Sequence, residues 1–203
     1  MDFSKITSNL TQLGYSVHEF NTSKEATDYL AKEIFGQTVG IGGSVTVKEM
    51  KLYEALEKNN EVYWHNKLPL PEGMTDADVR AKEGQAAIYI SSVNGIAETG
   101  EIVNIDRMGN RVSSISYGHK KVYLVVGENK IESDYERALY RARNVAAPLN
   151  AQRLNRKTPC AVKADKCYDC KSPDRLCKNL SVLWGKPMGA EYEVVLIHER
   201  LGY

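Results

Sequence analysis

Four cysteines lie close together in the last quarter of the chain, and their spacing is suited to metal chemistry. They are Cys160, Cys167, Cys170 and Cys177, in the pattern C-x6-C-x2-C-x6-C, within 18 residues of a chain of 203. The central C-x2-C pair can place two thiolates on one metal, and the flanking cysteines can complete a tetrahedron. The sequence therefore predicts a site for structural zinc or for an iron–sulfur cluster.

The cysteine spacing does not decide between these two groups. It matches neither the paired C-x2-C units of zinc knuckles nor the ferredoxin pattern. Lysines and Arg175 lie among the cysteines and would offset the negative charge of either group. Four unligated thiols or two disulfides are the alternative. A closed four-cysteine site has no open position, so we expect a role in folding or electron relay rather than in substrate activation.

A glycine-rich loop is the second feature that could do chemistry. Gly40, Gly42 and Gly43 lie between an apolar segment and an expected helix, followed by Ser44 and Thr46. Glycines let a phosphate or carboxylate approach the backbone, where the first turn of a helix leaves N–H groups unpaired and hydroxyls add donors. The pattern is neither G-x-G-x-x-G nor a P-loop. A tight turn without a ligand is the alternative interpretation.

A third candidate site is the segment that contains Glu98, Thr99 and Gly100, which follows a buried-type strand. Carboxylates beside glycines at the end of a strand often serve as acid–base or binding groups in α/β proteins. Glu98 is therefore the candidate catalytic residue. The alternative is a hairpin turn with a solvated Glu98, and Asp106 is expected in a surface loop.

The histidines and the clustered basic residues are weaker candidates for a functional site. His65 follows Trp64 at the end of an expected strand and could line a ligand cleft, although a packed or surface histidine is the simpler interpretation. A basic helix is expected to begin at a capping box, Ser133–Glu136, and to run to about Ala147. Its arginines and those after it could bind an acidic ligand or partner, or could form a solvated helix face.

The elements that must position these residues follow from hydrophobic periodicity and capping signals. Capping boxes at Thr22–Glu25 and Thr46–Glu49 predict helices. Further helices are expected at 3–13 and 75–84. The expected strands are residues 15–20, 38–41, 61–65, 86–93, 101–105 and 121–127.

Strands that alternate with helices predict βαβ units and a mostly parallel sheet. The strands at 86–93 and 101–105 are too close for an intervening helix, so we expect an antiparallel hairpin or an edge excursion there. The predicted organisation is an α/β domain at 1–150, a four-cysteine segment at 151–180, and C-terminal strands at 181–203 that return to the main domain.

Composition excludes several classes of protein. The net charge is +1, from 27 basic and 26 acidic residues, which does not favour a general nucleic-acid or membrane-surface binder. The first residues do not resemble a signal peptide, and no apolar run approaches the roughly 18–20 residues that span a bilayer. A cytoplasmic protein is therefore expected, in which cysteines are thiols or metal ligands.

Several segments together resemble the lactate-utilisation (LUD) domain family, in particular its short members with a C-terminal four-cysteine segment. They are "VGIGGSVTVKEM", "IAETGEIV", "GNRVSSISYG" and "RNVAAPLN". The resemblance implies a Rossmann-like fold of the ribose-phosphate isomerase and CoA-transferase type. It also implies an anion-binding loop at Gly42, Gly43, Ser44 and Thr46, with a second motif at Glu98, Thr99 and Gly100.

The resemblance also directs the functional prediction. LUD subunits are linked to L-lactate oxidation beside iron–sulfur partner subunits, and this association favours an iron–sulfur cluster at the cysteines. We expect a protein of organic-acid redox metabolism that binds a small anionic metabolite, a carboxylate or a phosphate. A phosphosugar isomerase or acyl/CoA transferase, with Glu98 as its base, is one alternative. A non-catalytic assembly or regulatory subunit is the other.

Overall fold

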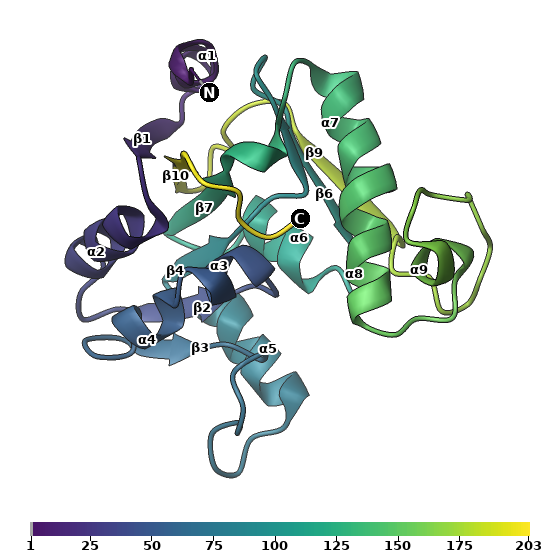
Figure 1. Ribbon diagram of the computed structural model, residues 1–203. Helices are drawn as coiled ribbons and strands as arrows, with labels where there is room; N and C mark the ends of the chain where they lie inside the picture. Colours follow the sequence, from purple (N-terminus) through teal and green to yellow (C-terminus); the bar gives the residue numbers. More distant parts are fainter. Residues whose placement is uncertain (1) are drawn as a thin grey trace.

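The alternation of strands and helices builds a six-stranded sheet in which every neighbouring pair of strands is parallel (Figure 1). The computed structural model describes residues 2–203. The strands are, in spatial order, β1 (Ser16–Phe20), β10 (Glu191–Ile197), β7 (Lys121–Gly127), β4 (Ile88–Ser91), β2 (Thr38–Ile41) and β3 (Glu61–Tyr63). The fold is a Rossmann-like open α/β structure, as the sequence predicts.

Helices cover both faces of this sheet, and the pattern of side chains on the strands explains why. Along β7, Val122, Leu124 and Val126 belong to one buried cluster, whereas Tyr123 and Val125 belong to another. Alternate residues of a strand point to opposite faces, so a strand that is apolar throughout must be covered twice. The helices of this part of the chain are α1 (Ser4–Gln12), α2 (Ser23–Glu33), α3 (Val45–Glu49), α4 (Leu52–Leu56), α5 (Asp76–Gln85) and α6 (Asn110–Ser116).

A second, four-stranded sheet lies beside the first. Its strands are, in spatial order, β8 (Ile131–Glu132), β5 (Gly95–Ala97), β6 (Ile102–Asp106) and β9 (Asn179–Leu183). A long helical segment packs on it through small residues such as Ala97 and Ala138 (Figure 1). This segment consists of α7 (Tyr135–Arg141), a π-helical turn (Ala142–Ala146) and α8 (Ala147–Arg153). The short helix α9 (Pro159–Lys163) and the cysteine-bearing loops lie beyond α8.

The strand order places a topological switch point between β2 and β4. After β2 the chain forms β3 on one side of it, and then returns to form β4 on the other side. The helical connections diverge at such a point, which leaves a crevice outside the carboxyl ends of the two strands. The glycine-rich loop follows β2, and Ser92 follows β4, so both border this crevice.

Three local predictions can be compared with the structure. The capping box at Thr22–Glu25 is confirmed. The one at Thr46–Glu49 is wrong, because α3 begins earlier and Ser44 is its N-cap. At the start of α7, Asp134 rather than Ser133 accepts a hydrogen bond from the backbone of Arg137.

The antiparallel pair in the middle of the chain exists, but its first strand is not the one expected. Residues of the predicted strand 86–93 form β4 inside the parallel sheet, and the separate strand β5 pairs with β6. The chain changes sheets at Asn94, whose N–H donates to the carbonyl of Val103. Among the helices of residues 2–203, none has both the length and the apolar character needed to cross a bilayer.

Candidate anion-binding cleft

A cavity of about 460 Å³ occupies the crevice at the switch point. Its walls come from the loops after β2 and β4, the start of α6, the turn that holds Lys130, and the inner side of α8. Its size is that of a site for a metabolite or a cofactor. The fold therefore places a pocket where open α/β proteins usually bind their ligands.

The side chains that line this cleft carry charge of mainly one sign. One acidic side chain, Asp106, is among them. The basic ones are Lys48, Arg80, Arg107, Arg111, Lys130, Arg153 and Arg156. Three of these arginines have ion-pair partners, because Arg80 pairs with Asp76, Arg111 with Asp106 and Arg156 with Asp174.

Three of the other four basic side chains, Lys48, Arg107 and Arg153, make the cleft positive. Within the part of the chain that the structure describes, Lys48, Arg107, Lys130 and Arg153 have no carboxylate within ion-pair distance. A cleft lined by charge of one sign concentrates ions of the opposite sign. The whole chain is almost neutral. The positive potential therefore belongs to this site and not to the protein at large.

The glycines of the loop after β2 have two different roles. Gly43 lines the cleft, together with Ser44 and Thr46. Gly40 and Gly42 do not line it. A Cβ atom at Gly40 would lie 2.8 Å from the Cα of Glu83 in α5, and one at Gly42 would lie 2.5 Å from the hydroxyl of Tyr89. These two glycines allow close packing inside the protein, so only Gly43 of the three is placed to meet a ligand.

The two hydroxyl residues of the loop also differ. Ser44 accepts a hydrogen bond of 3.2 Å from the N–H of Val47, and its own proton remains available to a ligand. The Thr46 hydroxyl donates to the carbonyl of Leu201 at 3.2 Å and accepts from Lys130 at 2.7 Å. Thr46 is therefore engaged by the protein. Since α3 has only five residues, side-chain charges rather than a helix dipole dominate the field.

Lys130 lies at the base of the cleft, in the short 3₁₀ turn Glu128–Lys130 that follows β7. It is 3% exposed, and its ammonium nitrogen bonds to the hydroxyls of Thr46 and Ser92 at 2.7 and 2.8 Å. Burial lowers the pKa of Lys130 to about 7, with a contribution from the positive charges of Arg141 and Arg111, against the opposing effect of Glu49. Within residues 2–203, this buried amine has no carboxylate as a counter-ion.

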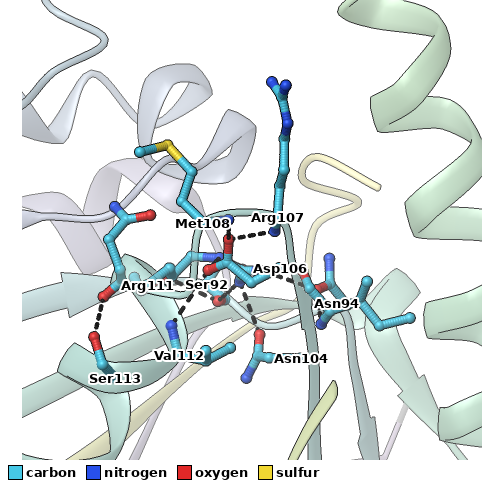
Figure 2. A network of polar contacts seen from close by, with 12 residues as sticks. Ser92, Asn94, Asn104, Asp106, Arg107, Met108, Arg111, Val112 and Ser113 are labelled. Carbon is cyan, nitrogen blue, oxygen red and sulfur yellow. Dashed lines mark hydrogen bonds and ion pairs between the residues drawn. The ribbon is translucent and has the colours of Figure 1, made fainter. Parts of the chain in front are cut away.

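Arg111 lines the cleft and holds neighbouring segments of its wall together by hydrogen bonds (Figure 2). One of its terminal nitrogens donates to the carbonyl of Ser92 at 3.1 Å and to the side chain of Asn104 at 2.8 Å. The other donates to the side chain of Asn94 at 2.9 Å and to the carbonyl of Ile105 at 2.8 Å. The terminal nitrogens of this guanidinium are therefore bonded to protein groups. Its side chain joins the loop after β4 to β6, and its positive charge adds to that of the cleft.

Asp106 has a structural role in the same network (Figure 2). One of its carboxylate oxygens accepts from the backbone N–H groups of Arg107 and Met108, at 2.6 and 3.2 Å. The other accepts from the N–H of Val112 in α6 at 3.3 Å. Asp106 thus holds the turn that leads into α6. Rather than lying in a plain surface loop, it borders the cleft.

His65 and Glu83 form a buried pair at the rim of the glycine loop. Nδ1 of His65 lies 2.7 Å from Oε1 of Glu83, and the backbone N–H of His65 donates to the same oxygen at 2.6 Å. The side chains are only 7% and 2% exposed. A carboxylate that accepts from Nδ1 leaves Nε2 to exchange a proton, and His65 lines the cleft beside Gly43. This arrangement can supply general acid–base chemistry.

The second predicted motif lies elsewhere. Glu98, Thr99 and Gly100 do not line the cleft. Glu98 pairs with Lys5 of α1 at 2.7 Å, and the Thr99 hydroxyl bonds to the side chain of Glu101. Gly100 has a φ of +108°, in the region that favours glycine, so the motif forms the tight turn between β5 and β6. The structure does not bring the carboxylate of Glu98 to the cleft.

All four cysteines line one small pocket at the end of α8. They are free thiols, so the two-disulfide alternative is not found. Positive side chains lie close to the sulfurs, since Arg143 is 3.9 Å from Cys167 and Arg175 is 3.3 Å from Cys177. Within residues 2–203, however, no three potential metal-binding side chains are close enough together to hold one ion. The thiols are gathered but not arranged as a closed site.

Some cleft residues were not identified as candidates from the sequence, although signals for them exist. Lys130 follows the apolar strand "KVYLVVG", and a polar residue at the carboxyl end of a parallel strand is a candidate ligand-binding residue. Arg153 and Arg156 belong to the basic stretch for which an acidic ligand was considered. No local signal identifies Arg111, because its partners come from the loop after β4 and from β6.

Comparison with known proteins identifies the type of domain. Residues 3–197 match the sequence model of the LUD domain. The fold resembles the crystal structure of a DUF162 family protein from Deinococcus radiodurans, with a TM-score of 0.55 and 12% identity over 97% of this chain and 99% of that one. This identity supports likeness of fold alone.

The eIF2B beta subunit from Chaetomium thermophilum is a weaker match, with a TM-score of 0.33 and 13% identity over 66% of this chain and 44% of that one. None of the curated proteins matches the sequence.

Proposed function

The chain belongs to the LUD domain family, and from this premise we propose that it binds a small organic anion with more than one charged or polar group. The observation that carries the proposal is the unbalanced charge of the cleft at the switch point. Three charged basic side chains there, Lys48, Arg107 and Arg153, have no acidic partner within the described residues. Buried or clustered charges without partners are unfavourable unless an anion offsets them.

The contacts available at the cleft indicate how such a ligand would be held. Gly43 permits close approach to the backbone, and Ser44 has a free hydroxyl proton. Arg107 and Arg153 are exposed side chains that line the cleft and can form bidentate contacts with a carboxylate or phosphate. Charge-assisted hydrogen bonds of this kind contribute about 1.5–3 kcal/mol each.

Isothermal titration calorimetry with L-lactate, pyruvate, citrate and pyrophosphate tests this proposal. At least one of these anions is expected to bind, with an affinity that falls as salt is added. The double variant Arg107→Gln/Arg153→Gln should weaken binding about tenfold or more. Lys32→Gln/Lys58→Gln, which removes the same charge from exposed positions outside the cleft, is the matched control. Equal losses in the two variants, or no binding of any anion, would contradict the proposal.

The family resemblance suggests that the anion is an organic acid of lactate-type redox metabolism. The cleft is compatible with a small carboxylate, but it equally suits a phosphate. The buried pair of His65 and Glu83 supports the alternative of an isomerase- or transferase-like enzyme, because it supplies the proton-transfer group that Glu98 does not. In the calorimetric series, preference for L-lactate or pyruvate favours the first assignment, and preference for pyrophosphate favours the second.

We also propose that the four-cysteine segment binds a metal, as either zinc or an iron–sulfur cluster. Four thiols around a single pocket, with Arg143 and Arg175 nearby to balance thiolate charge, support this proposal. The donor set suits both groups. The sulfurs are too dispersed for one ion, so the loops of the segment would have to close around zinc. When bound, zinc would stabilise the fold of the segment, whereas a cluster would carry electrons.

Anaerobic purification followed by metal analysis and a visible absorption spectrum tests the cysteine site. One zinc per chain without colour indicates the structural site, and iron with a brown colour that bleaches on reduction indicates a cluster. Cys167→Ser should abolish metal retention, and Val162→Ala, an exposed change in the same region, should not. Metal-free protein after anaerobic preparation would contradict the proposal, and so would equal retention by Cys167→Ser. A colourless protein that contains zinc would fit the alternative of a non-catalytic assembly or regulatory subunit.

A further inference from the structure

The surroundings of Lys130 suit a neutral amine better than an ammonium. The hydroxyl of Thr46 donates its proton to Leu201, so it must accept from Lys130. Ser92 provides the second acceptor. A neutral amine has two N–H bonds and one lone pair, whereas an ammonium has a third N–H, for which the described chain provides no acceptor.

The positive charges around Lys130 also favour its neutral form. Arg141 and Arg111 disfavour a further positive charge, and Glu49 is the acidic residue that opposes them. The carboxylate of Glu49 accepts from the backbone N–H of Gly202 at 2.6 Å, and no ion pair joins it to Lys130 in residues 2–203. Burial and these charges therefore favour the unprotonated amine over a pH range in which exposed lysines are charged. Such desolvated lysines are the ones that act as nucleophiles towards carbonyl groups.

We propose that Lys130 forms an imine with a carbonyl-bearing carboxylic acid, such as a 2-oxo acid, bound in the cleft. The inference rests on the proposed anion-binding function and names the class of ligand for the same site. The positive side chains of the cleft hold the carboxylate. The carbonyl carbon then comes within reach of an amine that already faces the cavity.

The step requires no oxidant or further reactant. The nitrogen lone pair of Lys130 attacks the carbonyl carbon, and the C–N bond forms as the C=O π electrons move to oxygen. One amine proton is transferred to that oxygen, which gives a carbinolamine. The hydroxyl group then leaves with the second amine proton as water, and a C=N bond remains. The pair formed by His65 and Glu83, at the rim of the same cleft, is a group that can carry these protons.

Trapping of the imine by reduction with cyanoborohydride tests the inference on the full chain. The protein is incubated with pyruvate or glyoxylate, reduced with sodium cyanoborohydride, digested and examined by mass spectrometry. One reduced adduct per chain, located on Lys130, is expected. Its yield should rise through a pH of about 7, because the pKa of Lys130 is lowered to about 7, whereas exposed lysines react near their ordinary pKa of about 10.4.

The control variants separate specific from random labelling. Lys130→Met should eliminate the adduct and should still fold, because an apolar side chain of similar length replaces a buried amine. Lys58→Met, at an exposed position outside the cleft, should leave the labelling of Lys130 unchanged. Labelling spread evenly over surface lysines, or no adduct with either acid, would overturn the inference.

Failure of the inference is distinguishable from failure of the proposed function. If pyrophosphate or citrate binds in the calorimeter and neither oxo acid gives an adduct on Lys130, imine formation is wrong while anion binding stands. A second outcome is that the labelling of Lys130 does not saturate as the oxo-acid concentration rises, and that no anion binds in the calorimeter. The amine would then be reactive, but the cleft would not be an anion site. The inference would fail together with the function on which it rests.

Discussion

At the scale of single residues, the close approach of neighbouring groups determines which side chains fit in β2 and the loop after it. Gly40 lies under the backbone of α5, and Gly42 lies against the buried hydroxyl of Tyr89. The sequence left two explanations for these glycines, the approach of an anion and a tight turn, and at Gly40 and Gly42 the structure places other parts of the protein. What the sequence could not provide was the identity of the neighbour, because Glu83 and Tyr89 are remote in the chain and reach the loop only through the tertiary fold.

Substitution of these glycines gives the first prediction. Gly40→Ala should lower the free energy of unfolding by about 2–4 kcal/mol, because the new Cβ atom meets backbone atoms of α5, which cannot move aside like a flexible side chain. Urea denaturation followed by circular dichroism measures the change.

The control is Gly84→Ala, in α5 itself. A Cβ atom there would be 4.0 Å from the hydroxyl oxygen of Ser114, which is an ordinary contact. Alanine is also the better helix former, so this variant should be as stable as the wild type or up to about 1 kcal/mol more stable. A similar loss in both variants would show that tight packing against α5 is not the reason for Gly40.

The candidate site was only partly predictable for the same reason. Gly43 and Ser44 could be identified locally, since they follow an apolar strand and precede a helix. Lys130 could have been found from its position after β7, but its burial depends on Thr46 and Ser92, which come from two other strand ends. Glu98 had the right local pattern but lies in a turn of the second sheet, because the chain leaves the first sheet at Asn94.

At the scale of elements, α1 and α5 lie within one residue of their predicted bounds, whereas the basic helix predicted to end near Ala147 continues through the π-helical turn and α8 to Arg153. Two hydroxyl residues near the start of α3 could each act as its cap. Ser44 does so because the side chain of Thr46 is buried and bonds to Leu201 and Lys130. A sequence pattern cannot distinguish these cases, since both residues have capping propensity.

A second prediction follows from the caps. Thr22→Ala should lower the free energy of unfolding by about 1 kcal/mol, because Thr22 accepts from the backbone of Glu25 in a complete capping box. Ser133→Ala should change it by less than about 0.5 kcal/mol, because Asp134 caps α7. Chemical denaturation of the two variants in parallel provides the measurement. A larger loss for Ser133→Ala than for Thr22→Ala would contradict this assignment of the caps.

At the scale of the whole molecule, the last strand of the chain completes the main sheet. β10 lies between β1 and β7, so the interior of the sheet forms only when both ends of the chain are in place. The residues that follow β10 reach the cleft, where Leu201 accepts from Thr46. Hydrophobic pattern alone predicted the parallel class of sheet, but strand order depends on pairings between distant segments, which the local pattern does not encode.

The buried amine at the centre of this arrangement should influence the stability of the entire protein. In the unfolded chain Lys130 has the ordinary pKa of about 10.4, and in the folded protein burial lowers the pKa to about 7. Between these values the unfolded state binds more protons than the folded state, so the contribution of Lys130 to stability increases as pH rises. Below about pH 7 both states are protonated, and the full cost of burying the charge is present.

The third prediction compares Lys130→Met with the wild type across this range, without ligand. At pH 6–7 the variant should be more stable by about 1–4 kcal/mol, because methionine removes the burial of an uncompensated charge. This advantage should shrink by up to about 1.4 kcal/mol per pH unit above pH 7 and approach zero near pH 10. Denaturation at several pH values measures the difference, with Lys58→Met as a control at an exposed lysine. A difference that stays constant with pH would mean that Lys130 is not held as a neutral amine, and the imine chemistry would lose its physical basis.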